Sequence, residues 1–314
     1  MLKYFITSIL VIALTACVTH QPKGYIKHVD NRAILKEKTQ LYVKIPDSSV
    51  ILIGKAAPSL NEADQFNMLY PAATPGDFFA GVIAHAIIVE SKKNEAKNSA
   101  QAAADVAVLP YRPYLKDVAN QALASQLENI VLARGFSLAR YEDSQSESDI
   151  ILDITPIFLM NQKQDTLTLR TQFLVYPKSE QHKSTKKRAV LYQNQIEVLS
   201  AKIDAALPQE YWLSNNGEQL VNTMRSLLSQ TLALGAIQIS SIESDHSNRV
   251  QHNFRYDDGD TTAFERASVI SNDCNRVVIN TLRGWLKSIP SERLKDKHIC
   301  QDIQESTLKR QSLN

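Results

Sequence analysis

Three consecutive segments with the pattern of long β-strands constrain the fold of this 314-residue chain more than any other feature. They span residues 150–160, 166–176 and 189–199. Each is longer than an average strand. In the middle segment, Leu169 and Phe173 point to one face and Arg170 points to the other, as expected for a sheet with one buried side. The short turn between the first two segments therefore predicts an antiparallel meander.

Segments with helical spacing of apolar residues flank this meander. We expect helices over residues 117–134 and 218–234, with Gly135 and Gly235 as their left-handed C-terminal stops. Short strands are expected at residues 106–109, 136–141 and 237–239. This order predicts an α+β fold, a two-layer sandwich with a mainly antiparallel sheet and both helices on one face.

The motif Ala133-Arg134-Gly135-Phe136 and the strand Asp149-Ile150-Ile151-Leu152-Asp153-Ile154 carry a resemblance within residues 105–239. This region resembles the small α+β domains of envelope lipoproteins concerned with assembly and export. Examples are the curli-secretion lipoprotein, activators of penicillin-binding proteins and auxiliary components of lipid transporters. The resemblance implies an assembly role and identifies no functional residue.

The N-terminal residues have the pattern of a secretory signal peptide. Lys3 precedes an apolar run, residues 4–14, which is too short to cross a bilayer as a stable helix. The next residues, Leu14-Thr15-Ala16-Cys17, resemble the lipobox of bacterial lipoproteins, in which the cysteine is lipidated and the chain is cut before it. This implies a lipid anchor on Cys17. Val18, which is not Asp, implies sorting to the outer membrane, facing the periplasm. The alternative is an ordinary secreted protein with Cys17 free.

Two other cysteines remain once Cys17 carries lipid. Cys274 and Cys300 would then pair in an oxidising periplasm, closing a loop that contributes about 3 kcal/mol to stability in the chain-entropy picture. Free thiols or a metal site are the alternatives, but no CxxC or HxxxH spacing occurs. We therefore expect a disulfide bond and no metal or cofactor.

Two helices and a hairpin are expected outside the α+β region. Residues 41–45 and 50–53 predict a β hairpin. Residues 78–89 are apolar on every side, which favours a buried core helix over a membrane or pore contact because the stretch is short. Residues 273–289 have amphipathic spacing that predicts a helix ended by Pro290. The expected parts are a signal peptide (1–16), a lipidated tether (17–24), an N-terminal part (25–104), the α+β core (105–240) and a C-terminal helical, disulfide-closed extension (241–314).

The net charge and the absence of known motifs limit the functions that can be assigned to the chain. Removal of Lys3 with the signal leaves 34 basic and 33 acidic residues, so no net field favours nucleic acid. The nucleophile-elbow, zinc-protease, Walker and dinucleotide motifs are absent from the sequence, and no catalytic residue can be named. The turn at residues 257–260 is acidic but lacks the spacing of a calcium loop, so we interpret it as a solvent-facing turn.

Basic side chains in two regions are the candidates for contact with an anionic surface. Residues 177–188 form a basic connection between strands, and the basic side of the expected C-terminal helix is the second region. The alternative for both is a solvated face. The candidate residues are Lys183, Lys186, Lys187, Arg188, Arg276, Arg283 and Lys287.

The sequence favours a non-enzymatic lipoprotein, anchored in the membrane, that binds an envelope protein through a sheet edge or the basic loop. One alternative is an oligomeric subunit of a secretion or transport assembly. Another is an envelope hydrolase without a recognisable motif. We expect no nucleic-acid partner.

Overall fold

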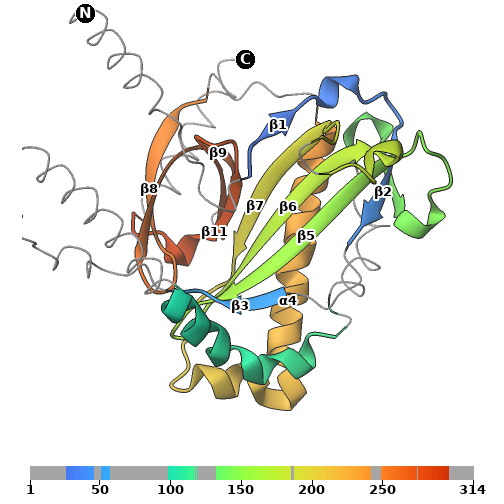
Figure 1. The fold of residues 1–314 in the computed structure, drawn as a ribbon. Coiled ribbons are helices and arrows are strands. Elements are labelled where there is room, and N and C mark those ends of the chain that lie inside the picture. Colours follow the sequence, from blue (N-terminus) through green and yellow to red (C-terminus); the bar gives the residue numbers. More distant parts are fainter. Residues whose placement is uncertain are drawn as a thin grey trace, which may run out of the picture.

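One mixed sheet dominates the computed structural model (Figure 1). The structure describes residues 26–45, 51–56, 98–116, 118, 132–184, 187–241, 249–273 and 275–296. Within this part of the chain, 11 strands form one sheet, and its main path runs β4-β2-β5-β6-β7-β11-β10-β9-β8. The strands are β1 (Val29–Asp30), β2 (Gln40–Lys44), β3 (Ile51–Gly54), β4 (Ser137–Arg140), β5 (Ile150–Met160), β6 (Leu167–Pro177), β7 (Tyr192–Leu199), β8 (Gln251–Asp257), β9 (Thr262–Asn272), β10 (Arg276–Thr281) and β11 (Leu286–Pro290).

The central meander is confirmed. β5 pairs with β6 and β6 with β7, both antiparallel, and the first pair is in register from Ile150 opposite Pro177 to Met160 opposite Leu167. Alternate residues of β6 are completely buried, as the pattern predicted: Leu167, Leu169, Thr171, Phe173 and Val175. The α+β class and the mainly antiparallel pairing follow from this arrangement.

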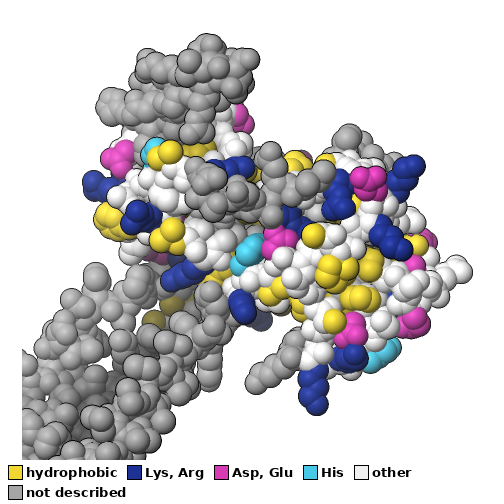
Figure 2. Space-filling model, turned by 90° about the horizontal axis from the view of Figure 1, so that it is seen from above, with side chains coloured by type: hydrophobic (Ala, Val, Ile, Leu, Met, Phe, Trp, Pro, Cys, Tyr) yellow, Lys and Arg dark blue, Asp and Glu magenta, His cyan; other side chains and the backbone are white. Residues whose placement is uncertain are grey.

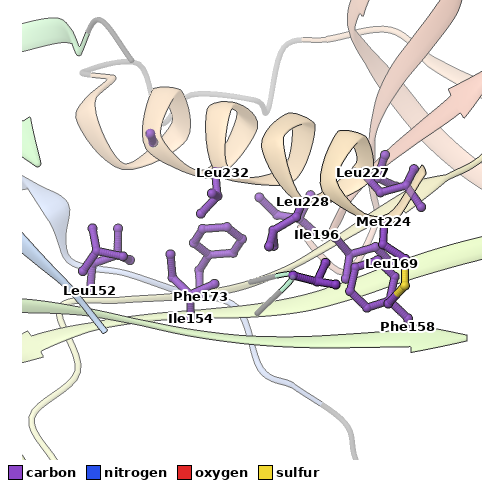
Figure 3. Packing of buried hydrophobic residues seen from close by; sticks show 14 of the residues in the cluster. Leu152, Ile154, Phe158, Leu169, Phe173, Ile196, Met224, Leu227, Leu228 and Leu232 are labelled. Atoms are coloured by element: carbon purple, nitrogen blue, oxygen red, sulfur yellow. The ribbon is translucent and has the colours of Figure 1, made fainter. Parts of the chain in front are cut away.

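Helix α4 (Pro208–Ser240) packs across β6 and β7 and covers the buried face of the meander (Figure 1). The main core lies between them. Figure 3 shows Leu228 and Leu232 of the helix against Phe173 and Ile196 of the strands. The predicted helix at 218–234 is confirmed at its start, because residues 214–217 are non-helical and kink α4 just before it. The helix continues to Ser240, so the predicted end at Gly235 and the strand at 237–239 are wrong.

Gly235 serves close packing instead of ending α4. A Cβ atom at this position would lie 2.3 Å from Cε1 of Phe173, far inside van der Waals contact. The glycine therefore lets the helix backbone approach the sheet. Its sequence signal is the same as that of a helix stop, which explains the wrong prediction.

The two N-terminal strands do not form the predicted hairpin. β2 and β3 both run parallel to β5, one after the other along its edge, with Leu41 opposite Ile150 and Ile51 opposite Ile157. β5 has eleven residues, and this length provides backbone partners for both short strands. β4 then pairs in parallel with β2, in agreement with the strand predicted at 136–141.

The predicted strand at 106–109 is also wrong. Residues 98–107 are helical, and a 3-10 helix, η3 (Leu109–Tyr114), follows. Asp105 accepts a hydrogen bond from the backbone N–H of Gly54 at 3.0 Å, and Gln101 donates to the carbonyl of Gly54 at 2.8 Å. Side chains from successive helical turns thus bind the end of β3.

The C-terminal region is a curled β sheet, so the predicted helix at 273–289 is wrong. β10 and β11 form an antiparallel hairpin here, with Val278 opposite Ser288. Gly284, at φ 80°, makes the tight turn that a helix prediction overlooked. β8 to β11 enclose a second core, which includes Phe254, Val277 and Ile289, beside the main sheet (Figure 1). We call β8–β11 the C-terminal curl.

Several predictions fall on residues outside the described part of the chain. They include the signal peptide, Cys17, the apolar segment 78–89, Lys186, Cys274 and Cys300. Of the helix predicted at 117–134, Val118 is helical and buried in the main core. The predicted end of this helix is wrong, because Leu132 is extended and η4 (Ala133–Gly135) is a 3-10 turn in which Gly135 is left-handed at φ 69°. Within the described ranges, no helix is long and apolar enough to cross a membrane.

The close approach at Gly235 generates a test. We expect Gly235→Ala to lower the free energy of unfolding by about 1–3 kcal/mol, because the new methyl group overpacks against Phe173. Helix propensity alone would predict the opposite sign, with alanine more stable by about 1 kcal/mol. Urea denaturation followed by circular dichroism measures the change. Adding Phe173→Leu to Gly235→Ala should recover part of the loss, and a single Gly235→Ala variant more stable than wild type would contradict this account.

Candidate functional site

A buried cluster of charged side chains lies where the meander meets the C-terminal curl. β7 and β11 pair in parallel here, with Lys287 opposite Glu197. Ile196 and Val198 of β7 point into the main core below α4. Because side chains alternate along a strand, Glu197 lies on the opposite face, toward the curl. We call this pairing of β7 with β11 the seam.

Glu197 is the centre of the seam cluster. Its Oε1 accepts hydrogen bonds from Nε of Arg170 at 2.8 Å and from Nε2 of Gln195 at 3.0 Å. Its Oε2 lies 3.3 Å from Nζ of Lys287. Only 9% of the Glu197 side chain is exposed. This carboxylate is therefore satisfied by three neighbouring side chains on strands β6, β7 and β11.

Lys287 connects the same cluster to the outer strands of the curl. Its Nζ lies 2.9 Å from Oε2 of Glu265 on β9 and donates to the hydroxyl of Tyr256 on β8 at 3.1 Å. Its side chain is 12% exposed. One ammonium group thus contacts strands β7, β8 and β9.

The environment keeps both groups of the central pair charged. Burial raises the pKa of Glu197, but the charges of Lys287 and Arg170 outweigh it, and the net pKa is lower than usual. Burial lowers the pKa of Lys287, but Glu197, Tyr256 and Glu265 outweigh it, and its net pKa is well above the usual value. Neither group exchanges its proton near neutral pH, so the pair is suited to holding strands together and unsuited to general acid–base catalysis.

Removing the lysine tests the structural role of the seam. We expect Lys287→Met to lower the free energy of unfolding by about 3–5 kcal/mol, because it removes the buried cation shared by Glu197 and Glu265 and leaves Glu197 with Arg170 alone. Lys183→Met is a matched control. Lys183 pairs with Glu180 at 2.7 Å with half its side chain exposed, and its loss should cost less than about 1 kcal/mol. If urea denaturation shows the same small loss of unfolding free energy in both variants, the seam is not a stabilising cluster.

A second polar cluster surrounds the first described residues of the chain. Both carboxylate oxygens of Asp30 accept hydrogen bonds from the Arg32 guanidinium at 2.7 Å. Nη1 of Arg32 donates to Oγ of Ser241, just after α4, at 3.1 Å. The guanidinium also lies 5.2 Å from the ring centroid of Tyr192. The N-terminal segment is therefore bound to both β7 and the end of α4.

His28 packs edge-on against Tyr192, with ring centroids 6.0 Å apart. Its burial lowers the pKa; the charge of Asp30 and hydrogen bonds involving Asn194 and the backbone of Gln193 act to raise it, and the charge of Arg32 lowers it further. The net pKa lies below the ordinary value of 6.5. The imidazole is consequently neutral at pH 7.

The shifted pKa of His28 predicts a pH dependence of stability. Because the unfolded chain binds this proton more tightly than the folded chain, the contribution of His28 is fully present above about pH 6.5 and is lost as the pH falls through the lower folded pKa. We expect His28→Gln to flatten the fall in urea midpoint between about pH 7 and about pH 5. His252→Gln is the control, because His252 is exposed on β8. An unchanged slope in the His28 variant would refute the assignment.

The structure separates the basic residues predicted to face one anionic surface. In the 177–188 connection, Lys183 pairs with Glu180, whereas Arg188 donates to the carbonyl of Gln181 at 2.9 Å and lies over the ring of Tyr176 at 4.2 Å. Lys187 is exposed. Figure 2 shows basic, acidic and hydrophobic side chains interspersed on the upper face.

The basic residues of the wrongly predicted helix have different environments. Arg276 donates to the carbonyl of Leu199 at 2.7 Å and to that of Ser288 at 2.9 Å, and burial lowers its pKa. Lys287 belongs to the seam. Arg283 alone is exposed, at the hairpin turn. Arg276 and Lys287 are therefore structural, which corrects their prediction as surface contacts.

The acidic turn is not the solvent-facing turn that we predicted. Asp258 binds Lys55, and Asp260 accepts a hydrogen bond from the backbone N–H of Gln162 at 3.1 Å. Asp257 accepts from the backbone N–H of Gly259 at 2.8 Å. The contact of Asp260 docks the β8–β9 turn onto the β5–β6 turn, and that of Asp258 joins it to the residue after β3. Across the described ranges, no three His, Cys, Asp or Glu side chains are placed to hold a metal ion.

Sequence reasoning missed Glu197 and Glu265, the carboxylates of the seam. Glu197 stands between Ile196 and Val198 in a predicted strand, and a charge between two apolar residues was the available signal. For Glu265 the sequence offered no such signal, because β9 was not predicted.

Comparisons with known proteins add no function. No family model matches the chain. No curated protein matches it either. A solved structure titled "Crystal structure of uncharacterized protein" aligns over 66% of this chain and 95% of its own, with 13% identity and a TM-score of 0.27.

Proposed function

We propose that this chain is a lipoprotein of the bacterial outer membrane, anchored through Cys17, that faces the periplasm and binds an envelope protein without catalysing a reaction. The observation that carries the proposal is the apolar run followed by Leu14-Thr15-Ala16-Cys17. Two or three acyl chains give stable anchoring, whereas one is marginal. The short stretch from Cys17 to the first described residue, Ile26, would serve as the tether.

The arrangement of charged groups supports a binding role. The most deeply buried pair, Glu197 and Lys287, is held in one ionisation state by its neighbours. Such a pair supplies rigidity, which suits a surface that must keep its shape while a partner docks. We propose that the partner docks at β4, where the main path of the sheet begins. A strand at a sheet edge offers backbone donors and acceptors to an added strand.

Two structural details complete the proposal. The first is a two-layer sandwich in which the helix expected from residue 117 onward lies on the face covered by α4. The helical Val118, buried in the same core as Leu227 and Leu228, supports that placement. The second is a disulfide between Cys274 and Cys300. It would join the β9–β10 turn, where Cys274 stands, to the segment beyond Lys295.

The anchor is tested by changing its cysteine. Cys17→Ser should move the protein from the outer-membrane fraction to the soluble fraction, and mass spectrometry of the wild-type N-terminal peptide should show acyl chains on Cys17. Cys274→Ser is the matched control, because it removes a cysteine without removing the anchor and should fractionate like wild type. A wild-type protein that is soluble, or a Cys17→Ser protein that stays in the membrane, would overturn the anchor.

Cross-linking in cells tests the binding role in the same strains. The anchored protein should give one discrete cross-linked product from a photoreactive residue at Ser137 on β4. The same residue at Thr262, exposed at the start of β9, should not give it. Equal labelling at both positions would exclude β4 as the docking strand.

A further inference from the structure

We propose that the β10–β11 turn, residues 282–285, is the membrane-facing tip of the molecule and contacts anionic phospholipid headgroups. This inference rests on the proposed lipid anchor. It adds which part of the folded domain meets the bilayer. We call residues 282–285 the hairpin tip.

The first argument is that the chain meets the folded domain at the hairpin tip. Nε1 of Trp285 donates a hydrogen bond to the carbonyl of Ile26 at 2.9 Å. A Cβ atom on Gly284 would lie 2.8 Å from Cγ of His28, so the turn and the N-terminal segment are in direct contact. β1 then pairs with β7, and Asn31 donates its backbone N–H to Leu191 at 2.8 Å. The position of Ile26 is fixed beside the tip.

The second argument is the length of the tether. Ile26 follows Cys17 by nine residues. A fully extended chain of that length reaches about 30 Å at most. A lipidated Cys17 therefore holds this end of the domain close to the bilayer, whereas the opposite end, with the β8–β9 turn docked on Gln162, can lie farther away.

The third argument is the chemistry of the tip. Leu282 is 68% exposed, a large apolar side chain at the end of a hairpin. Arg283 next to it is exposed, and its guanidinium lies 5.1 Å from the ring centroid of Trp285. Lys27 is exposed on the facing segment, and nearby Asp30 is already paired with Arg32. An apolar residue with two cations suits the interface of an anionic bilayer, where the apolar group enters the acyl boundary and the cations meet phosphate.

The same combination elsewhere on the surface provides a matched control. Phe264 is 72% exposed, and Arg255 lies 5.6 Å from its ring centroid. This pair lies on β8 and β9 and, among the residues that the structure describes, makes no hydrogen bond to the segment 26–31. If exposure and charge alone caused membrane contact, both the hairpin tip and the Phe264–Arg255 pair would contact the membrane. If the tether determines which surface meets the bilayer, only residues 282–285 will contact it.

Tryptophan quenching tests the proposal in the full lipidated chain. Vesicles of phosphatidylethanolamine and phosphatidylglycerol with brominated acyl chains quench indole groups at the interface. Trp212 is 1% exposed and donates to the carbonyl of Gln164 in the β5–β6 turn, so it should stay unquenched. We expect quenching from Trp285, its loss in Trp285→Phe, and its loss in Leu282→Ser/Arg283→Ser. Phe264→Ser/Arg255→Ser should be quenched like wild type. Vesicles of phosphatidylcholine alone should give weaker quenching.

The outcomes separate failure of the tip from failure of the anchor. Protein that carries acyl chains on Cys17 and floats with the vesicles, yet shows no quenching, would overturn the tip and leave the anchor intact. If Cys17 carries no acyl chain, the proposed anchor fails. Coupling Cys17 to a maleimide lipid then still measures the tip, and quenching that disappears only in the Leu282→Ser/Arg283→Ser variant supports it. Loss of quenching in both double variants would overturn it.

Discussion

The parallel pairing of β7 with β11 is the constraint on which the rest of this structure depends. Three residue pairs, from Leu286 opposite Ile196 to Ser288 opposite Val198, join the meander to the C-terminal curl. Parallel pairs are slightly less stable per residue than antiparallel ones. A parallel pairing as short as the seam therefore needs additional stabilisation from its side chains. On one face Leu286 extends the core beneath α4. On the other, Glu197 and Lys287 bring β6, β8 and β9 into one ion-pair cluster.

The N-terminal segment reinforces the seam at its upper end. It pairs with β7 through β1, contacts the β10–β11 turn through His28, and binds the end of α4 through Arg32. One segment of a few residues therefore contacts the meander, the curl and the helix. If the chain is anchored at Cys17, any force on the tether reaches all three elements through contacts that are already made, which favours a domain that keeps its orientation at a membrane.

The sequence predicts the elements whose signal lies within their own residues. It does not predict the elements whose structure depends on contacts between distant parts of the chain. β5, β6 and β7 are long and alternate in polarity, so they were predicted nearly within their bounds. The apolar stripe of α4 predicted the helix after its kink at residues 214–217 but not its end at Ser240. The spacing of Val278, Leu282 and Trp285 fits one side of a helix, yet the left-handed Gly284 and the β-branched residues of β10 give a hairpin. β2 and β3 read as hairpin strands because their common partner, β5, is about a hundred residues away. Arg170 and Lys287, the charged partners of Glu197, are likewise distant in sequence, so the ion pairs of the seam had no local signature.

Native-state hydrogen exchange tests the central claim most directly, because it measures the free energy of opening for each strand separately. If the seam makes the meander and the curl one cooperative unit, the slowest amides of β6, β7, β10 and β11 should open with the same free energy and the same dependence on urea. Lys287→Met should then separate them, with the curl opening first. A wild-type protein in which β10 and β11 already exchange at a much lower free energy than β6 and β7 would contradict the claim that the seam holds the two cores together.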